Sequence, residues 1–276
     1  MKTVELLSQV RCFILDMDGT FYLDDHLLPG ALELLELLNQ QGIPYLFLTN
    51  NSSRHRGQYA EKLARLGAVV SEDKIFTSGE ATALYLQQRF PGTRLFVVGT
   101  PALEDELQNH GFKLVQDNPE CIVLGFDTTL TYAKLWKLCD HVRSGLPYYA
   151  THPDFNCPIV GGFMPDIGAM IAFVDASTGR KPDVVIGKPN LPIVDALVAR
   201  TGLPVAEMAM VGDRLYTDIA LGQAGVKTIL VLSGETKIDD LATSPFQANL
   251  VMRDLAELVD WMNQVVPGKP LNIISL

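Results

Sequence analysis

The sequence predicts an α/β fold with a largely parallel sheet, and three observations support this prediction. Short apolar runs alternate with amphipathic segments in the first third of the chain. The same alternation returns in the last third, and a stretch of roughly 100 residues between them, enough for a domain, repeats it. Strands that alternate with helices favour right-handed βαβ crossovers, which produce parallel sheets.

The first third is predicted to hold three strands and two helices. The strands are short apolar runs at 12–16, 45–48 and 75–77. One helix is expected from Pro29 and Gly30 to about residue 39, with leucines at helical spacing. The second carries Tyr59, Leu63 and Leu66 on one face and stops at Gly67, a C-cap signal.

The last third follows the same pattern. We expect helices from Pro189 to about 202, near 217–224 and from Asp254 onward, with strands at 208–211 and 227–232. The middle stretch is predicted to contain strands at 95–99 and 122–125, helices at 102–109 and 131–144, a loop-rich piece at 151–168, and a helix from Ala169. The predicted domains are therefore a core of residues 1–79 plus 186–276 and an inserted domain of residues 80–185.

The composition argues against several classes of partner. The 276 residues include 32 Asp and Glu against 22 Lys and Arg, a formal net charge of −10. Nucleic acids and anionic membrane surfaces need clustered cations, and the sequence shows no such cluster. The N-terminus lacks a signal-peptide pattern, and no uncharged apolar run reaches the ~18 residues of a membrane span. We expect a cytoplasmic protein without nucleic-acid or membrane partners; a homo-oligomer remains open.

The segment Asp16-Met17-Asp18-Gly19-Thr20 carries the most information about function. It follows the apolar run 12–15 directly, and strand alternation would put Asp16 and Asp18 on the same side. Two carboxylates crowded at the end of a core strand are costly without a cation or a shared proton. Alone, the pair also reads as a turn with Asx-type hydrogen bonds.

Three further places share this position at the carboxyl end of a predicted strand or the start of the next helix. They are Thr49-Asn50, Lys188 and Gly212-Asp213. In open parallel sheets the ligand crevice lies at that edge, so we expect these residues to meet there. Taken singly, a helix cap, a surface lysine and a turn explain them equally well. Together they suit a divalent metal ion plus a phosphoryl group.

The four motifs resemble, in order and spacing, those of the haloacid dehalogenase-like (HAD) phosphatases. The matching segments are Asp16–Thr20, Leu48–Asn51, Gly187–Pro189 and Gly212–Asp218. The insertion between the second and third motifs, with Val98–Pro101 and Ala176–Pro182, resembles the C2-type cap of the NagD-like branch. The resemblance covers nearly the whole chain. It implies a Rossmann-like three-layer core with an inserted α/β cap domain.

The resemblance also implies roles for individual residues. Asp16 would be the nucleophile that forms an aspartyl-phosphate, and Asp18 the general acid and base. Mg²⁺ would be held by Asp16, Asp213 and the backbone carbonyl of Asp18. The phosphate-binding residues would be Thr49, Asn50, Asn51 and Lys188, and Asp218 would orient a neighbour from outside the direct contacts.

The expected function is Mg²⁺-dependent hydrolysis of small phosphorylated metabolites, such as nucleoside monophosphates, sugar phosphates and p-nitrophenyl phosphate. Two alternatives stay open: a phosphotransferase that uses the same intermediate, and a non-catalytic phospho-accepting switch domain. The five histidines show no metal spacing, so surface or capping roles are expected for them. His152 is the partial exception, because the segments 151–156 and 161–168 are candidates for lining the substrate cleft. Phe155 and Phe163 are candidates for stacking on a nucleobase.

Overall fold

The computed structural model describes residues 2–159 and 161–264, and it divides into two compact units. Unit 1 comprises residues up to 47, 66–68 and those from 198 onward, and unit 2 comprises residues 48–65 and 69–197. The predicted core and cap have other boundaries, and helix α4 (Ser78–Arg89) runs across the one at 79/80. That division stays a prediction. Residues 1, 160 and 265–276 of the predicted domains lie outside the described residues.

A parallel sheet forms the centre of unit 1. Its strands β1 (Cys12–Leu15), β4 (Tyr45–Thr49), β13 (Met208–Gly212), β14 (Lys227–Val231) and β15 (Leu250–Met252) belong to the sheet order β15-β14-β13-β1-β4-β5. β1 pairs with β13 and β4, and β14 with β13 and β15, all in parallel. Every residue of β1, β4 and β13 is buried, as expected of strands covered on both faces. The unit boundary falls within β4, and β5 (Ile75–Thr77) belongs to unit 2.

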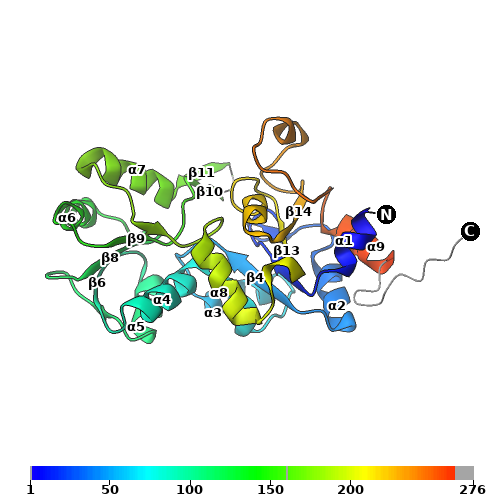
Figure 1. Ribbon diagram of the computed structural model, residues 1–276, viewed down its shortest axis with the longest axis horizontal. Coiled ribbons are helices and arrows are strands. Elements are labelled where there is room, and N and C mark those ends of the chain that lie inside the picture. Colours follow the sequence, from blue (N-terminus) through cyan, green and yellow to red (C-terminus); the bar gives the residue numbers. More distant parts are fainter. Residues whose placement is uncertain (1, 160, 265–276) are drawn as a thin grey trace, which may run out of the picture. The chain divides into compact units, whose positions relative to one another are not determined.

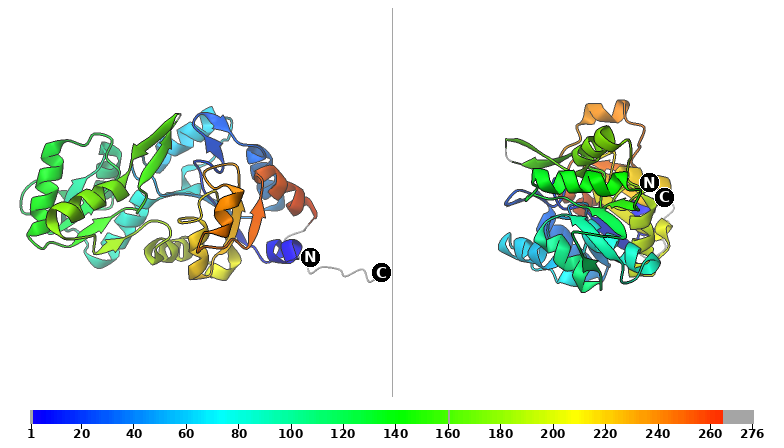
Figure 2. Two further views of the ribbon diagram at one scale, coloured as in Figure 1. Left: turned by 90° about the horizontal axis from the view of Figure 1, so that it is seen from above. Right: turned by 90° about the vertical axis from the view of Figure 1, so that its left-hand side faces the viewer.

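Three helices lie at one end of unit 1: α1 (Lys2–Ser8), α2 (Ala31–Gln41) and α9 (Leu255–Gln264) (Figures 1 and 2). α9 contacts both α1 and α2. Gly30 permits the close approach of α2, since a Cβ there would lie 2.1 Å from the Ala256 backbone nitrogen. The helix predicted near 217–224 is instead a 3₁₀ segment, η3 (Ile219–Ala224); Gly222 within it and Gly225 directly after it disfavour an α-helix. Short elements β2 (Tyr22–Leu23), β3 (His26–Leu27), η2 (Val205–Glu207) and η4 (Ile238–Ala242) complete the unit.

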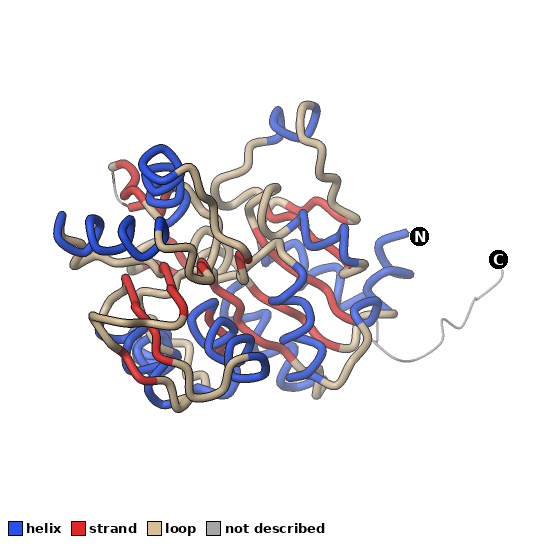
Figure 3. The backbone as a smooth tube through the Cα atoms, turned by 60° about the vertical axis from the view of Figure 1, so that its left-hand side comes forward, coloured by secondary structure: helices blue, strands red, loops and turns tan. Residues whose placement is uncertain are grey.

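Unit 2 contains a second parallel sheet. Its strands β6 (Arg94–Val98), β7 (Lys113–Leu114), β8 (Cys121–Leu124), β9 (Tyr148–Ala150) and β12 (Val184–Val185) follow the order β12-β9-β8-β6-β7. Helices α6 (Tyr132–Arg143) and α7 (Ile167–Thr178) pack with Phe96 and Val98. Helices α4 and α5 (Pro101–Asn109) pack with Leu95 and Val97 of the same strand. Alternate residues of β6 therefore face two helical layers, and the predicted α/β class with parallel sheets is confirmed (Figures 1 and 3).

Other helices of unit 2 are α3 (Arg56–Arg65) and η1 (Glu72–Lys74), and α8 (Leu191–Thr201) continues across the unit boundary. The piece predicted to be loop-rich, 151–168, contains an antiparallel hairpin, β10 (Asn156–Ile159) with β11 (Gly162–Pro165). α7 starts at Ile167 rather than Ala169, because the side chain of Asp166 caps it. No helix within the described residues is long and apolar enough to cross a membrane.

Candidate active site

Three buried carboxylates come together in unit 1. Asp16, Asp213 and Asp218 each offer an oxygen, and these atoms lie within 4.8 Å of one another. The strand register explains the first two, because Leu15 of β1 lies beside Val211 of β13 and the Asp16 amide donates to the Val211 carbonyl at 2.9 Å. Asp16 and Asp213 thus follow neighbouring strands at the same edge of the sheet, as predicted.

Asp218 reaches this group because Gly212 leaves room for it. A Cβ on Gly212 would lie 2.3 Å from the Asp218 Cβ. The Arg214 amide donates to Asp218 Oδ2 at 3.1 Å, which fixes the carboxylate from the turn after β13. Asp218 was expected to orient a neighbour; in the structure its carboxylate is one of the three clustered groups.

Asp213 is held on several sides. The Thr20 hydroxyl donates to Oδ1 at 3.1 Å, and the Glu235 amide donates to Oδ2 at 2.7 Å. Two glycines press their backbones against this carboxylate: a Cβ would lie 2.4 Å from Oδ2 at Gly19 and 2.0 Å from it at Gly234. The sequence pattern did not identify Glu235 or Gly234, because neither lies in one of the four motifs.

Electrostatic repulsion inside the group is visible in Asp213. Burial is the larger cause of the rise and the neighbouring Asp218 carboxylate the second; with the hydrogen bond from Glu235 offsetting part of the rise, they bring the pKa of Asp213 to about 6. A cation among the three carboxylates would favour the ionised form. The donors are oxygen atoms only, which fits a hard divalent ion such as Mg²⁺ or Ca²⁺ better than a metal that prefers nitrogen or sulfur.

Asp18 lies in the turn that follows β1. β1 ends at Leu15, so strand alternation does not set the direction of the Asp18 side chain. The chain turns instead, and the Gly19 amide donates to the Tyr22 carbonyl at 2.8 Å. Gly19 has φ +90°, which glycine adopts without strain. Asp18 is half-buried, and the Tyr22 hydroxyl donates to its Oδ2 at 3.4 Å.

The predicted phosphate-binding residues Thr49, Asn50, Asn51 and Lys188 all belong to unit 2. Asn50 and Lys188 are joined directly: the Lys188 amide donates to Asn50 Oδ1 at 2.8 Å, and Asn50 Nδ2 donates to the Lys188 carbonyl at 3.0 Å. The Lys188 ammonium is buried and donates to the Leu48 carbonyl at 3.2 Å. Thr49 Oγ1 accepts from the Asn51 amide at 3.1 Å, and Asn51 Oδ1 accepts from the Ser53 amide at 2.9 Å.

Unit 2 holds a cluster of titratable side chains that the sequence did not predict. His152, Asp154 and Asp166 are buried, with ligand atoms within 4.8 Å of one another. His152, the partial exception among the five histidines, has no exposed surface. Its Nε2 lies 3.0 Å from Asp166 Oδ1, and the same oxygen accepts from the Ile167 amide at 2.7 Å. These contacts make the group part of the α7 cap. The signal in the sequence was the run of polar residues after the unpredicted strand β9.

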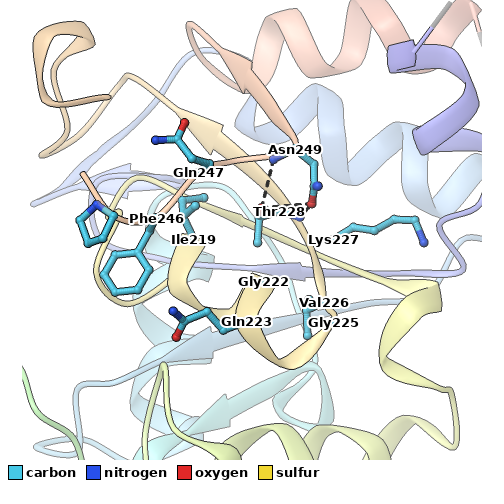
Figure 4. A pocket seen from close by; sticks show the side chains of 11 residues that line it. Ile219, Gly222, Gln223, Gly225, Val226, Lys227, Thr228, Phe246, Gln247 and Asn249 are labelled. Atoms are coloured by element: carbon cyan, nitrogen blue, oxygen red, sulfur yellow. Dashed lines mark hydrogen bonds between the residues drawn. The ribbon is translucent and has the colours of Figure 1, made fainter. Parts of the chain in front are cut away.

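Unit 1 also has a cavity of about 370 Å³ (Figure 4). It lies beside η3 and the start of β14, with Gln223, Phe246 and Gln247 on its wall. The Thr228 amide donates to Asn249 Oδ1 at 2.8 Å and closes one side. None of the motif residues lines this cavity.

Two family models match the chain. One, described as haloacid dehalogenase-like hydrolase, covers residues 13–113, and the other, described as HAD-hydrolase-like, covers residues 185–258. Among curated relatives, an acid sugar phosphatase of Staphylococcus aureus is 33% identical over 92% of this chain and 98% of its own length. The 5'-nucleotidase YutF of Bacillus subtilis is 32% identical over 93% of this chain and 100% of its own.

Solved structures agree with these matches. The 4-nitrophenylphosphatase of Thermotoga maritima aligns with a TM-score of 0.90 at 48% identity, covering 92% of this chain and 98% of that one. A glycerol phosphate phosphatase of Mycobacterium tuberculosis, in complex with calcium, aligns with a TM-score of 0.84 at 30% identity, covering 92% and 76%. The chain therefore belongs to the haloacid dehalogenase-like hydrolases, as a NagD-like phosphatase that acts on phosphoric monoesters.

Proposed function

We propose that the protein is a Mg²⁺-dependent phosphatase of small phosphorylated metabolites that works through an aspartyl-phosphate on Asp16. The observation that carries the proposal is the buried group of Asp16, Asp213 and Asp218. Three carboxylates bring three negative charges, which Mg²⁺ and one lysine would balance. The cation would neutralise the developing charge on the phosphoryl group.

In this proposal the side chains divide the reaction between them. Asp16 attacks phosphorus in line with the leaving oxygen, so that one O–P bond forms as the ester bond breaks. Asp18 gives its proton to the leaving oxygen and then takes a proton from the water that hydrolyses the aspartyl-phosphate.

We further propose that Thr49, Asn50, Asn51 and Lys188 bind the same phosphoryl group. The strand register supports this. Leu15 of β1 pairs with Phe47 of β4. Asp16 directly follows Leu15, and Thr49 lies two residues after Phe47. Asn50 and Lys188 are tied together by two hydrogen bonds, so a ligand that engages one engages a pre-organised pair. Lys188 supplies a compact positive charge to a dianionic ester.

The substrate class we propose is small phosphate esters of sugars, glycerol or nucleosides. The curated relatives are named for sugar phosphates and nucleotides. Phe155 and Phe163 are exposed by 61% and 64% on and beside the β10–β11 hairpin, and an exposed aromatic ring is a surface on which a base or sugar stacks. The cytoplasmic location, the absence of nucleic-acid partners and the oligomeric state stay predictions.

A panel of phosphate esters tests this proposal. We expect p-nitrophenyl phosphate, a nucleoside monophosphate and a sugar phosphate to be hydrolysed with Mg²⁺, and all activity to stop in excess EDTA. Asp18→Asn should slow hydrolysis of every ester by about 10²–10⁴-fold, the usual contribution of a general acid and base. Substantial turnover in EDTA would contradict the metal requirement. A faster reaction with added acceptor alcohols would identify a phosphotransferase instead.

A further inference from the structure

The carboxamide of Asn50 is held by three hydrogen bonds inside unit 2. It makes the two contacts to the Lys188 backbone described above, and its Nδ2 also donates to Asp154 Oδ2 at 3.1 Å. A carboxylate can only accept and a backbone amide can only donate. The Lys188 amide therefore fixes the Oδ1 end, while the Lys188 carbonyl and Asp154 accept the two N–H groups of Nδ2.

The space around this contact is fully used. A Cβ added to Gly187 would lie 2.6 Å from Asn50 Oδ1, 2.8 Å from the Thr151 carbonyl and 2.9 Å from the His152 Cβ. Asn50, Asp154 and Lys188 are each at most 6% exposed. Because buried groups are closely packed, Lys188 cannot shift unless Asn50 shifts with it. Asp154, which anchors the Asn50 side chain, thus also restrains the Lys188 backbone.

Asp154 is itself fixed from the opposite side. Its carbonyl accepts from the Gly168 amide at 2.7 Å, and the Phe155 carbonyl accepts from the Asp166 amide at 2.9 Å. The contact of His152 with Asp166 ties the same loop to the first turn of α7. Asp154 therefore connects the start of α7 with Asn50 and, through it, with Lys188.

We propose that Asp154 is a positioning residue: it anchors the Asn50 carboxamide and thereby holds Lys188 where the reaction needs its ammonium group. The inference rests on the proposed role of Lys188 in binding the phosphoryl group, and it adds a residue outside the four motifs. Removal of the acceptor leaves one buried N–H of Asn50 without its partner, so that only the two contacts to the Lys188 backbone hold the carboxamide. Asn50 and the Lys188 backbone are then less restrained, and the hydrogen bond to the Lys188 amide opens more often.

Three variants of one buried residue type test the proposal. Asp154→Ala removes the acceptor, whereas Asp154→Asn keeps an oxygen within reach of Asn50 Nδ2. Asp127→Asn is the matched control, because Asp127 is 3% exposed in the same unit and bonds to Thr129 and Lys134, not to Asn50. We expect kcat/KM for p-nitrophenyl phosphate to fall by about 10-fold or more in Asp154→Ala, and by less than about 3-fold in the other two.

Hydrogen exchange at the Lys188 amide, followed by NMR, gives a readout that does not depend on turnover. It should accelerate by about 10-fold or more in Asp154→Ala and stay unchanged in Asp154→Asn and Asp127→Asn. Should Asp154→Ala not fold, Asp154→Ser takes its place, since its hydroxyl is too short to reach Asn50.

Equal losses of kcat/KM in Asp154→Ala and Asp127→Asn would overturn the inference, and so would a loss without faster exchange at Lys188. Unchanged kinetics and exchange in Asp154→Ala would overturn it as well. Failure of the proposed function looks different, because the wild-type protein would then hydrolyse no phosphate ester at all. The exchange rates would still decide whether Asp154 holds Lys188.

Discussion

The two units hold their functional side chains in contrasting ways. In unit 1, Asp16, Asp213 and Asp218 repel one another in a buried place, and the pKa of Asp213 rises to about 6. In unit 2, Asn50 and Lys188 are matched donor to acceptor, with Asp154 completing the set. The three carboxylates of unit 1 are unfavourable without an added positive charge, whereas the hydrogen-bonded residues of unit 2 are stable without any added group. We infer that an ion completes unit 1, whereas unit 2 is pre-organised.

The largest expected effect is the loss of the nucleophile from unit 1. Asp16→Asn should lower kcat for p-nitrophenyl phosphate by about 10⁴-fold or more, because an amide cannot form the aspartyl-phosphate. The measurement is steady-state hydrolysis with Mg²⁺. Asp25→Asn is the control, since Asp25 is exposed nine residues further along the chain. Equal activity of both variants would remove Asp16 from the mechanism.

The next prediction separates the electrostatic cost of the Asp213 carboxylate from its role in activity. Asp213→Asn should stabilise the metal-free protein at pH 7.5 by on the order of 1–3 kcal/mol, because it removes a buried charge. The same variant should lose both activity and the rise in Tm that Mg²⁺ gives the wild type. Thermal unfolding with Mg²⁺ and with EDTA measures both. A destabilised metal-free variant would show that the group is not strained.

The pH dependence follows from the direction of the Asp213 shift. Its pKa is about 6 in the folded protein and 3.8 for the free side chain, so the folded state holds this proton more tightly. The stability that this proton adds to the folded state is fully present below about pH 3.8 and is lost as the pH rises through about 6. Urea unfolding between pH 4 and 7.5 gives the free energy of unfolding of the metal-free wild type and of Asp213→Asn, and the difference between the two isolates the effect. A difference independent of pH would contradict it.

The smallest effect tests the packing of unit 2. Gly187→Ala should destabilise the protein by about 1–3 kcal/mol, because its Cβ has no room beside Asn50 and Thr151. Gly162→Ala is the matched control, since nothing lies within 4 Å of a Cβ there. Urea unfolding measures both variants. Equal stability of the two would mean that the Asn50 contact yields without cost.

Sequence patterns predicted the core of both sheets because their strands are continuous apolar runs. β1, β4, β6, β8, β13 and β14 lie within one or two residues of their predicted ranges. The strands missed were short or polar: β12 has two residues, and the β10–β11 hairpin contains Pro158 and Pro165 and has no fully buried residue in either strand. Proline weakens a strand signal, so the hairpin resembled a loop.

The same limit applies to the site. Asp16, Asp213 and Lys188 stood out because each follows a strand or precedes a helix in a recognisable motif. Asp154 did not, since its partner is distant in sequence: it bonds to Asn50, 104 residues earlier. Only the tertiary fold brings such pairs together, and a single sequence shows no pattern for them.

The most direct test of the central claim is a calorimetric titration of Mg²⁺ into the metal-free protein at pH 7.5, with hydrolysis assayed on the same samples. One ion should bind per chain, activity should rise in proportion to occupancy, and Asp213→Asn should neither bind nor turn over. Full activity before any ion binds would contradict the account.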